Sequence, residues 1–151
     1  MKWITREKVK VDRVACPWLL QKFVDPQAEF IFVPAEQVES QARELSAIPF
    51  DMEGCELGHH GQDVSFDSIL KKYRLEDAAL HLLAEIVRAA DSHPSNPHPA
   101  GEGLRWVAFG FSALNLSDHE ILQREFIVYD ALYAECQRRV AQTASPLQRS
   151  P

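Results

Sequence analysis

The sequence lacks the paired cysteines that zinc-binding modules and disulfide-stapled domains require. Its three cysteines, Cys16, Cys55 and Cys136, are odd in number, lie far apart and form no CxxC spacing. Structural zinc sites and disulfide frameworks both depend on such pairs, so neither is expected here. Unpaired cysteines are typical of a reducing compartment, and we expect a cytoplasmic protein.

Long apolar runs and an excess of positive charge are also missing. No apolar run approaches the roughly 18 residues of a membrane-spanning helix, and residues 1–13 lack the apolar core of a signal peptide. The net charge is −6, whereas a nucleic-acid surface needs a basic stripe. Phosphate-binding glycine motifs and the GxSxG motif are absent as well. We therefore expect neither a membrane nor a nucleic acid as a partner.

What the sequence does contain is the material for one globular core. With 151 residues, of which 46% are hydrophobic, the chain fits a single domain. In its first third, β-branched or aromatic runs alternate with segments whose apolar residues recur at helical spacing. The expected strands cover 2–5, 29–33 and 48–50, and the expected helices cover 13–24 and 35–45. This order predicts an α/β fold, helix-rich, with a small, partly parallel β-sheet.

The remainder of the chain has the pattern of successive helices. Proline is tolerated only in the first turn of a helix, so Pro17 predicts that the first helix begins near Cys16. We expect the domain to cover residues 1–141 and residues 142–151 to form a disordered tail. The later helices are expected to open at Ser65, after a cap at Asp77, over 103–114, and after a cap at Ser117 with an end near Val140.

The densest group of metal-binding side chains lies between residues 48 and 67. Carboxylate and imidazole groups together suit a divalent first-row metal, and we expect zinc, manganese, iron or nickel. Three glycines separate the polar residues and argue against a helix. The group comprises Asp51, Glu53, Cys55, Glu56, His59, His60 and Asp63.

Sequence spacing leaves the choice of histidine in this group open. On a helix, Glu56 would share a face with both His59 and His60, whereas in an extended chain it would share a face with His60 alone. In a turn neither rule applies. The alternative to a metal site is a pair of surface histidines in a glycine-rich loop.

Four further positions could contribute to such a site. Asp91 follows a helix and could bring in a distant carboxylate, unless it only forms an Asx turn. His119, in the first turn of the last helix, is either a further ligand or an exposed histidine. Arg13 could bind an oxyanion bidentately together with helix N–H groups, or it could pair with a carboxylate. In a first turn Cys16 would have its thiolate favoured by the helix dipole; otherwise it is a buried core residue.

Several segments are specific enough to identify a family. They include DRVACPWL, IPFD, ELGHHG, SFDSILKKY, LAEIVRAAD and VYDALYAEC. On these segments the chain resembles the C-terminal domain of the chromate-resistance ChrB family, over about residues 2–136. In that family a separate N-terminal region precedes this domain in a chromate-responsive regulator. The resemblance therefore implies a stand-alone version here, without DNA binding.

The resemblance also implies which residues form the site. The family pattern falls on an Asp-Arg pair, on the glutamate and first histidine of ELGH, on a phenylalanine and on a later acid. It favours His59 over His60, which falls at a variable position. In this sequence the pattern gives Asp12, Arg13, Glu56, His59, Phe66 and Asp91.

Together these observations predict a cytosolic accessory or sensor protein of chromate or oxyanion stress. The alternative is a metal-dependent hydrolytic or redox enzyme with Glu56 or Asp91 as its base. The expected partners are a divalent metal ion and a small oxyanion such as chromate. A homodimer is compatible with the sequence. The predicted site consists of Glu56, His59 and Asp91 for the metal, His60 or His119 as a further ligand, and Arg13 for the anion.

Overall fold

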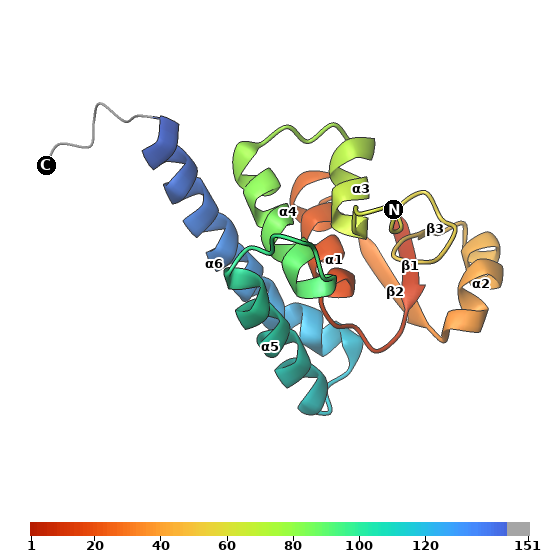
Figure 1. Cartoon of the computed structure of the whole chain (residues 1–151). Helices are drawn as coiled ribbons and strands as arrows, with labels where there is room; N and C mark the ends of the chain where they lie inside the picture. Colours follow the sequence, from red (N-terminus) through yellow and green to blue (C-terminus); the bar gives the residue numbers. More distant parts are fainter. Residues whose placement is uncertain (145–151) are drawn as a thin grey trace, which may run out of the picture.

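The computed structural model describes residues 1–144, and residues 145–151, which hold most of the predicted tail, lie outside that part. A short parallel sheet forms one end of the molecule and a group of helices forms the other (Figure 1). The elements are β1 (Lys2–Arg6), α1 (Asp12–Phe23), β2 (Glu29–Val33), the 3₁₀ helix η1 (Ala35–Gln37), α2 (Val38–Leu45), β3 (Ile48–Pro49), α3 (Ser65–Lys72), α4 (Ala78–Asp91), α5 (Ala100–Ala113) and α6 (Asp118–Ala144).

The sheet has the order β2-β1-β3, and both strand pairs are parallel. Side chains alternate along β1, so Trp3 and Ile4 belong to different faces. Trp3 packs in the main core, whereas Ile4 packs with Val38 in a smaller cluster beneath α2. Helices therefore cover both faces of the sheet, and the predicted α/β class is confirmed.

The first helix begins earlier than the position of Pro17 predicts. α1 starts at Asp12 rather than near Cys16, so Pro17 lies in its second turn. The N–H groups of Val14 and Ala15 both donate to the carbonyl of Val11, which closes the first turn before the proline is reached. Most of α1 is buried, and this packing outweighs the hydrogen bond that a proline removes from a helix interior. The early start matters because it makes Asp12 the first residue of the helix.

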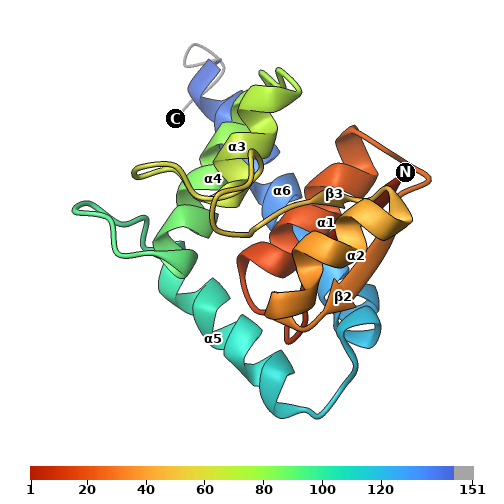
Figure 2. The same cartoon turned by 90° about the vertical axis from the view of Figure 1, so that its right-hand side faces the viewer.

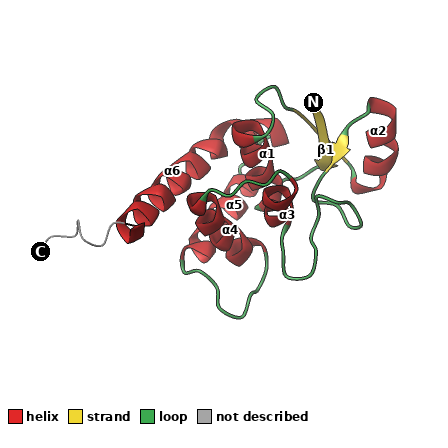
Figure 3. Cartoon of the chain, turned by 90° about the horizontal axis from the view of Figure 1, so that it is seen from above, coloured by secondary structure: helices red, strands yellow, loops and turns green. Residues whose placement is uncertain are grey.

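The long helix α6 begins near β2, where His119 packs against Phe32, and extends away from the sheet, so that its C-terminal part lies opposite α2 (Figure 3). The hydroxyl of Ser117 accepts the N–H of Glu120 at 3.2 Å, which confirms the predicted cap. The helix continues to Ala144, beyond the predicted end near Val140. It is amphipathic, and no described helix is both long and apolar enough to cross a bilayer.

α4 and α5 pack so closely that Gly101, near the start of α5, has no room for a side chain. A Cβ atom at Gly101 would lie 2.4 Å from the Cβ of Ala89 on α4. We expect Gly101→Ala to lower the free energy of unfolding by about 1–3 kcal/mol, because the helices must move apart. A Cβ at Gly103 would meet nothing within 4 Å, so Gly103→Ala should instead raise the free energy of unfolding by about 1 kcal/mol, measured at low protein concentration. Urea unfolding of both variants measures the difference, and equal effects would contradict the packing argument.

Candidate metal centre

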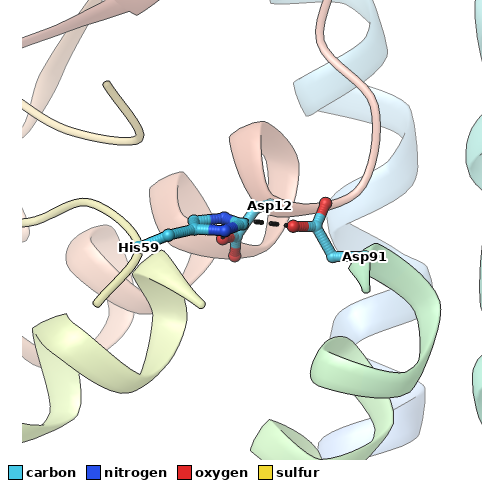
Figure 4. Close-up of side chains that lie close together, drawn as sticks. All are labelled: Asp12, His59 and Asp91. Atoms are coloured by element: carbon cyan, nitrogen blue, oxygen red, sulfur yellow. Dashed lines mark ion pairs between the residues drawn. The ribbon is translucent and has the colours of Figure 1, made fainter. Parts of the chain in front are cut away.

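Four polar side chains from distant parts of the chain converge beside the N-terminus of α1. The Nε2 atom of His59 lies 3.3 Å from Oδ2 of Asp12, 3.4 Å from Oδ1 of Asp51 and 3.2 Å from Oδ2 of Asp91. In Figure 4 the tip of the His59 imidazole points toward Asp91, and Asp12 lies beside that tip. Asp12 begins α1, Asp51 follows β3, His59 lies in the loop before α3, and Asp91 ends α4.

Asp12 is fixed by the starts of two helices. The backbone N–H of Ser65, the first residue of α3, donates to Oδ2 of Asp12 at 2.8 Å. The thiol of Cys16, one turn further along α1, donates to Oδ1 at 3.3 Å. Unpaired N–H groups at helix N-termini favour a negative charge. The carboxylate of Asp12 is thus held in place although its side chain is buried.

Asp51 is held by two arginines and a serine. Arg6 and Arg13 each donate to its Oδ2 at 3.2 Å, and the hydroxyl of Ser65 donates to its Oδ1 at 2.7 Å. Its backbone adopts φ of +51°, a left-handed conformation in which Asp is one of the few tolerated residues. This turn at the end of β3 aims the carboxylate at His59.

The loop that carries His59 folds back on itself at Gly58. A Cβ at this position would lie 2.5 Å from the carbonyl oxygen of Met52, so only glycine fits. The carbonyl oxygen of Gly58 accepts the hydroxyl of Ser68 on α3 at 2.6 Å. The loop is therefore anchored immediately before His59, and the imidazole is held toward the carboxylates.

The carboxylates outnumber the positive charge that His59 provides. Burial and the neighbouring carboxylates of Asp12 and Asp51 raise the pKa of Asp91 to about 7. Burial also raises the pKa of Asp12. Burial alone would raise the pKa of Asp51 too, but hydrogen bonds from His59 and Ser65 outweigh it and lower that pKa. Hydrogen bonds to Asp12 and Asp51 raise the pKa of His59 to about 10. A cluster with these shifts favours additional positive charge.

Among the described residues, Asp12, His59 and Asp91 form a group whose ligand atoms all lie within 4.8 Å of one another. Two ligands bound to one ion at 2.0–2.2 Å stand about 3.0–3.5 Å apart. The 3.2 Å and 3.3 Å separations from His59 to the two carboxylates match this spacing. The donor set of two carboxylates and one imidazole therefore fits a divalent first-row metal with little movement.

The structure does not bring Glu56 or His60 into this cluster. The carboxylate of Glu56 is exposed and pairs with Lys72 at 2.8 Å. The ring Nε2 of His60 hydrogen bonds to the backbone oxygen of Glu56 at 2.8 Å, outside the cluster. Of the two adjacent histidines, His59 faces the carboxylates, which is the choice that the family pattern favours.

The other predicted site residues have different surroundings. The ring of His119 packs edge-on against Phe32 at 5.1 Å between centroids, and Phe66 is fully buried in the core. Of the two alternatives for Cys16, the structure shows the buried core residue, and burial and the nearby carboxylate of Asp12 raise the pKa of its thiol. Arg13 donates to Asp51 and to the carbonyl of Lys8 at 2.9 Å, so it pairs with a carboxylate here.

Asp51 is the member of the cluster that sequence reasoning did not single out. It was visible as part of the polar group after the strand Ile48–Pro49. Side chains at the carboxyl ends of parallel strands commonly line the site of an α/β fold. Applying that rule to β3 would have selected Asp51, which turns directly out of this strand.

An open cavity leads to His59. Its volume is about 400 Å³, and it lies between two loops that project on the same side of the molecule (Figure 2). One wall contains His59 and residues 61–64, and the other contains residues 92–95. A larger cavity of about 680 Å³ lies elsewhere, between α2 and residues 49–55. The smaller cavity is the relevant one because it contacts the cluster.

The comparisons with known proteins agree on one family. Residues 3–136 match the family model described as ChrB, C-terminal domain. Protein ChrB of Cupriavidus metallidurans is 33% identical over 132 residues, which cover 87% of this chain and 39% of that protein. The chain thus spans about two fifths of the length of this relative. No solved structure matches.

Proposed function

The chain belongs to the family of ChrB C-terminal domains, and from this premise we propose that it binds a divalent metal ion through Asp12, His59 and Asp91. The binding would serve as an accessory or sensing step in the chromate or oxyanion stress response that the family resemblance implies. The single observation behind this proposal is the convergence of three ligand atoms from α1, the His59 loop and α4.

The donor chemistry narrows the choice of metal. Oxygen and imidazole donors suit manganese, iron, zinc or nickel, whereas the thiol of Cys16 is buried and already donates to Asp12. Asp51 contacts the same Nε2 atom of His59 that would bind the metal, at 3.4 Å, so its carboxylate is a further oxygen donor beside the proposed ion. The sequence predicted Glu56, His59 and Asp91 as metal ligands, and in the present proposal Asp12 replaces Glu56.

An anion would approach from the cavity between the two loops. The Arg13 guanidinium is engaged with Asp51 and Lys8, so an anion could bind it only by displacing one of these partners. Three protein ligands leave positions on a metal for water or a small anion. We therefore place the proposed oxyanion in the cavity between the two loops, where it would adjoin a metal held by the cluster.

A metal-dependent enzyme is the second candidate. The observation that favours it is the open cavity beside the cluster, because three protein ligands leave positions on a metal for a substrate or for a water that the metal activates. Water proton relaxation of the manganese-loaded protein separates the candidates. Metal-bound water that chromate displaces supports the oxyanion site, whereas fast-exchanging water that chromate leaves in place supports an open catalytic site.

The metal proposal is tested by comparing the two adjacent histidines. We expect His59→Ala to weaken binding by at least about 100-fold, since a lost ligand costs more than the about 10–100-fold typical of a lost supporting residue. His60→Ala should change affinity little, because its ring hydrogen bonds to a backbone oxygen outside the cluster. Isothermal titration of the tag-free protein with Zn²⁺ and Mn²⁺ measures both. A wild-type protein that takes up neither these ions nor Fe²⁺ or Ni²⁺ would rule out the proposal.

A further inference from the structure

One face of α5 exposes an unusual amount of apolar surface. Trp106 is 74% exposed, Phe109 49% and Leu114, just after the helix, 58%. Among the three tryptophans, Trp3 and Trp18 are buried. α5 lies at the edge of the molecule in Figure 2, away from the sheet. Exposed apolar surface of this kind marks an interaction site.

We propose that this face, formed by residues 102, 103, 106, 109, 110 and 113, binds the same face of a second copy of the chain. The six positions recur at spacings of three and four, and all six are exposed. They therefore form one stripe along α5, opposite the buried residues Leu104 and Ala108. The inference does not depend on the proposed metal site, which lies at the start of α1 and the end of α4.

Two glycines in the stripe have no role inside the single chain. A Cβ atom at Gly103 or Gly110 would meet nothing within 4 Å, in contrast to Gly101, which is required by Ala89. Glycine in an exposed helix interior is unfavourable relative to alanine, so internal packing does not explain these two residues. Close approach of another helix does explain them, because small residues let a large neighbouring side chain insert.

The spacing of these residues suits an antiparallel pair. In such a pair the two α5 helices run in opposite directions and are related by a two-fold axis that passes between residues 106 and 107. Gly103 of each copy then lies opposite Gly110 of the other copy. Each Trp106 then enters a hole bordered by both glycines of the partner copy. The knob and its hole lie on the same surface, as a two-fold symmetric interface requires.

Charge at the ends of the stripe is also self-complementary. The ammonium of Lys10 lies 5.0 Å from the ring centre of Phe109. In the antiparallel arrangement Glu102 of the other copy comes within about 3 Å of Phe109 along the helix axis, from the rise of 1.5 Å per residue. Within one chain Glu102 accepts the indole N–H of Trp106 at 3.1 Å and lies 4.0 Å from Arg105. In the dimer Glu102 of each copy can pair with Lys10 of the other in place of the Arg105 contact, while it keeps the bond from Trp106.

The size of the face indicates a weak, reversible dimer. Fully buried aromatic side chains contribute about 150–250 Å² each, so the exposed parts of Trp106 and Phe109 supply about 300 Å² per copy. Leu114, which lies beside the face and is 58% exposed, adds about 100 Å². The total, with its polar margin, is close to the lower limit of about 1,000 Å² for specific interfaces. We expect monomer and dimer to coexist at micromolar concentrations.

Sedimentation equilibrium of the metal-free protein, from about 5 to about 500 µM, tests the proposal across the range in which weak complexes dissociate. Trp106→Ala should weaken dimerisation at least 10-fold. Iodide quenching of tryptophan fluorescence should decrease as the wild-type concentration rises, because the exposed tryptophan, Trp106, becomes covered. Ile127→Ala, which removes an exposed apolar side chain on α6, is the matched control and should leave dimerisation unchanged.

The glycines and the charges give two sharper tests. The double variant Gly103→Ala, Gly110→Ala should raise the thermal midpoint of the dilute monomer and yet weaken dimerisation at least 10-fold. Glu102→Lys and Lys10→Glu should each weaken it, and the two changes combined should restore most of the loss. A protein that stays monomeric throughout the concentration range overturns the proposal. So does a dimer that Ile127→Ala disrupts and Trp106→Ala does not.

Discussion

Replacing Glu125 with glutamine should stabilise the protein at pH 9 by up to about 4 kcal/mol and have almost no effect near pH 4. Glu125 lies on α6 and is fully buried, and neither of its carboxyl oxygens has a hydrogen-bond partner. Burial raises its pKa from the usual 4.5 to about 8. A neutral glutamine of the same shape removes the need to ionise a group inside the core.

The direction of the pH effect follows from the raised pKa. Below pH 4.5 Glu125 is protonated in both the folded and the unfolded chain, so it causes no pH-dependent loss of stability. Between pH 4.5 and about 8 the unfolded chain releases this proton and the folded protein retains it, so the free energy of unfolding falls. Above pH 8 the penalty is complete and constant.

Urea unfolding of wild type and Glu125→Gln at several pH values between 4 and 9 measures this effect as a difference, in which the other titrating groups largely cancel. Glu120→Gln, which removes an exposed carboxylate from the first turn of α6, is the control and should give no stabilisation that grows with pH. A Glu125→Gln difference that does not grow with pH would show that Glu125 ionises at its ordinary pKa.

The elements of the fold that sequence could predict are those whose signal is local. The strand Glu29–Val33 and the cap at Asp77, which accepts the N–H of Ala79 at 2.8 Å, are confirmed. Of the two starts that the sequence offered for α1, near Arg13 and near Cys16, the later one is wrong because burial of most of the helix outweighs the local effect of Pro17. Local rules fail where tertiary packing supplies more free energy than the residue's own preference.

The candidate site was predictable only in part, for the same reason. His59 and Asp91 were selected from the family pattern, and the structure places their side chains 3.2 Å apart. The carboxylates of Asp12 and Asp51 reach His59 through contacts between α1, α3 and β3, which no spacing along the chain encodes. Glu56 lies three residues from His59 but faces Lys72, because the turn at Gly58 separates them.

Replacing Asp12 with asparagine should separate metal binding from folding. The asparagine would keep the size of the side chain and an oxygen that accepts the N–H of Ser65, which donates to Asp12 at 2.8 Å. The change would remove one of the two carboxylate ligands, so we expect affinity for Zn²⁺ or Mn²⁺ to fall by at least about 100-fold. It would also relieve repulsion between Asp12 and Asp91 but weaken the hydrogen bond between Asp12 and His59, which helps to raise the pKa of His59 to about 10. These effects oppose each other, so we expect the stability of the metal-free protein to change little.

Thermal unfolding with and without metal measures both effects. At a free metal concentration of about 100 times the dissociation constant, wild type should gain about 2.7 kcal/mol of stability, whereas Asp12→Asn should gain almost none. Glu56→Gln is the matched control, because its carboxylate faces Lys72 outside the cluster, and it should keep the full metal-dependent gain. If Glu56→Gln lost the gain and Asp12→Asn kept it, the ligand would be Glu56, and the 52–64 loop would have to rearrange when the metal binds.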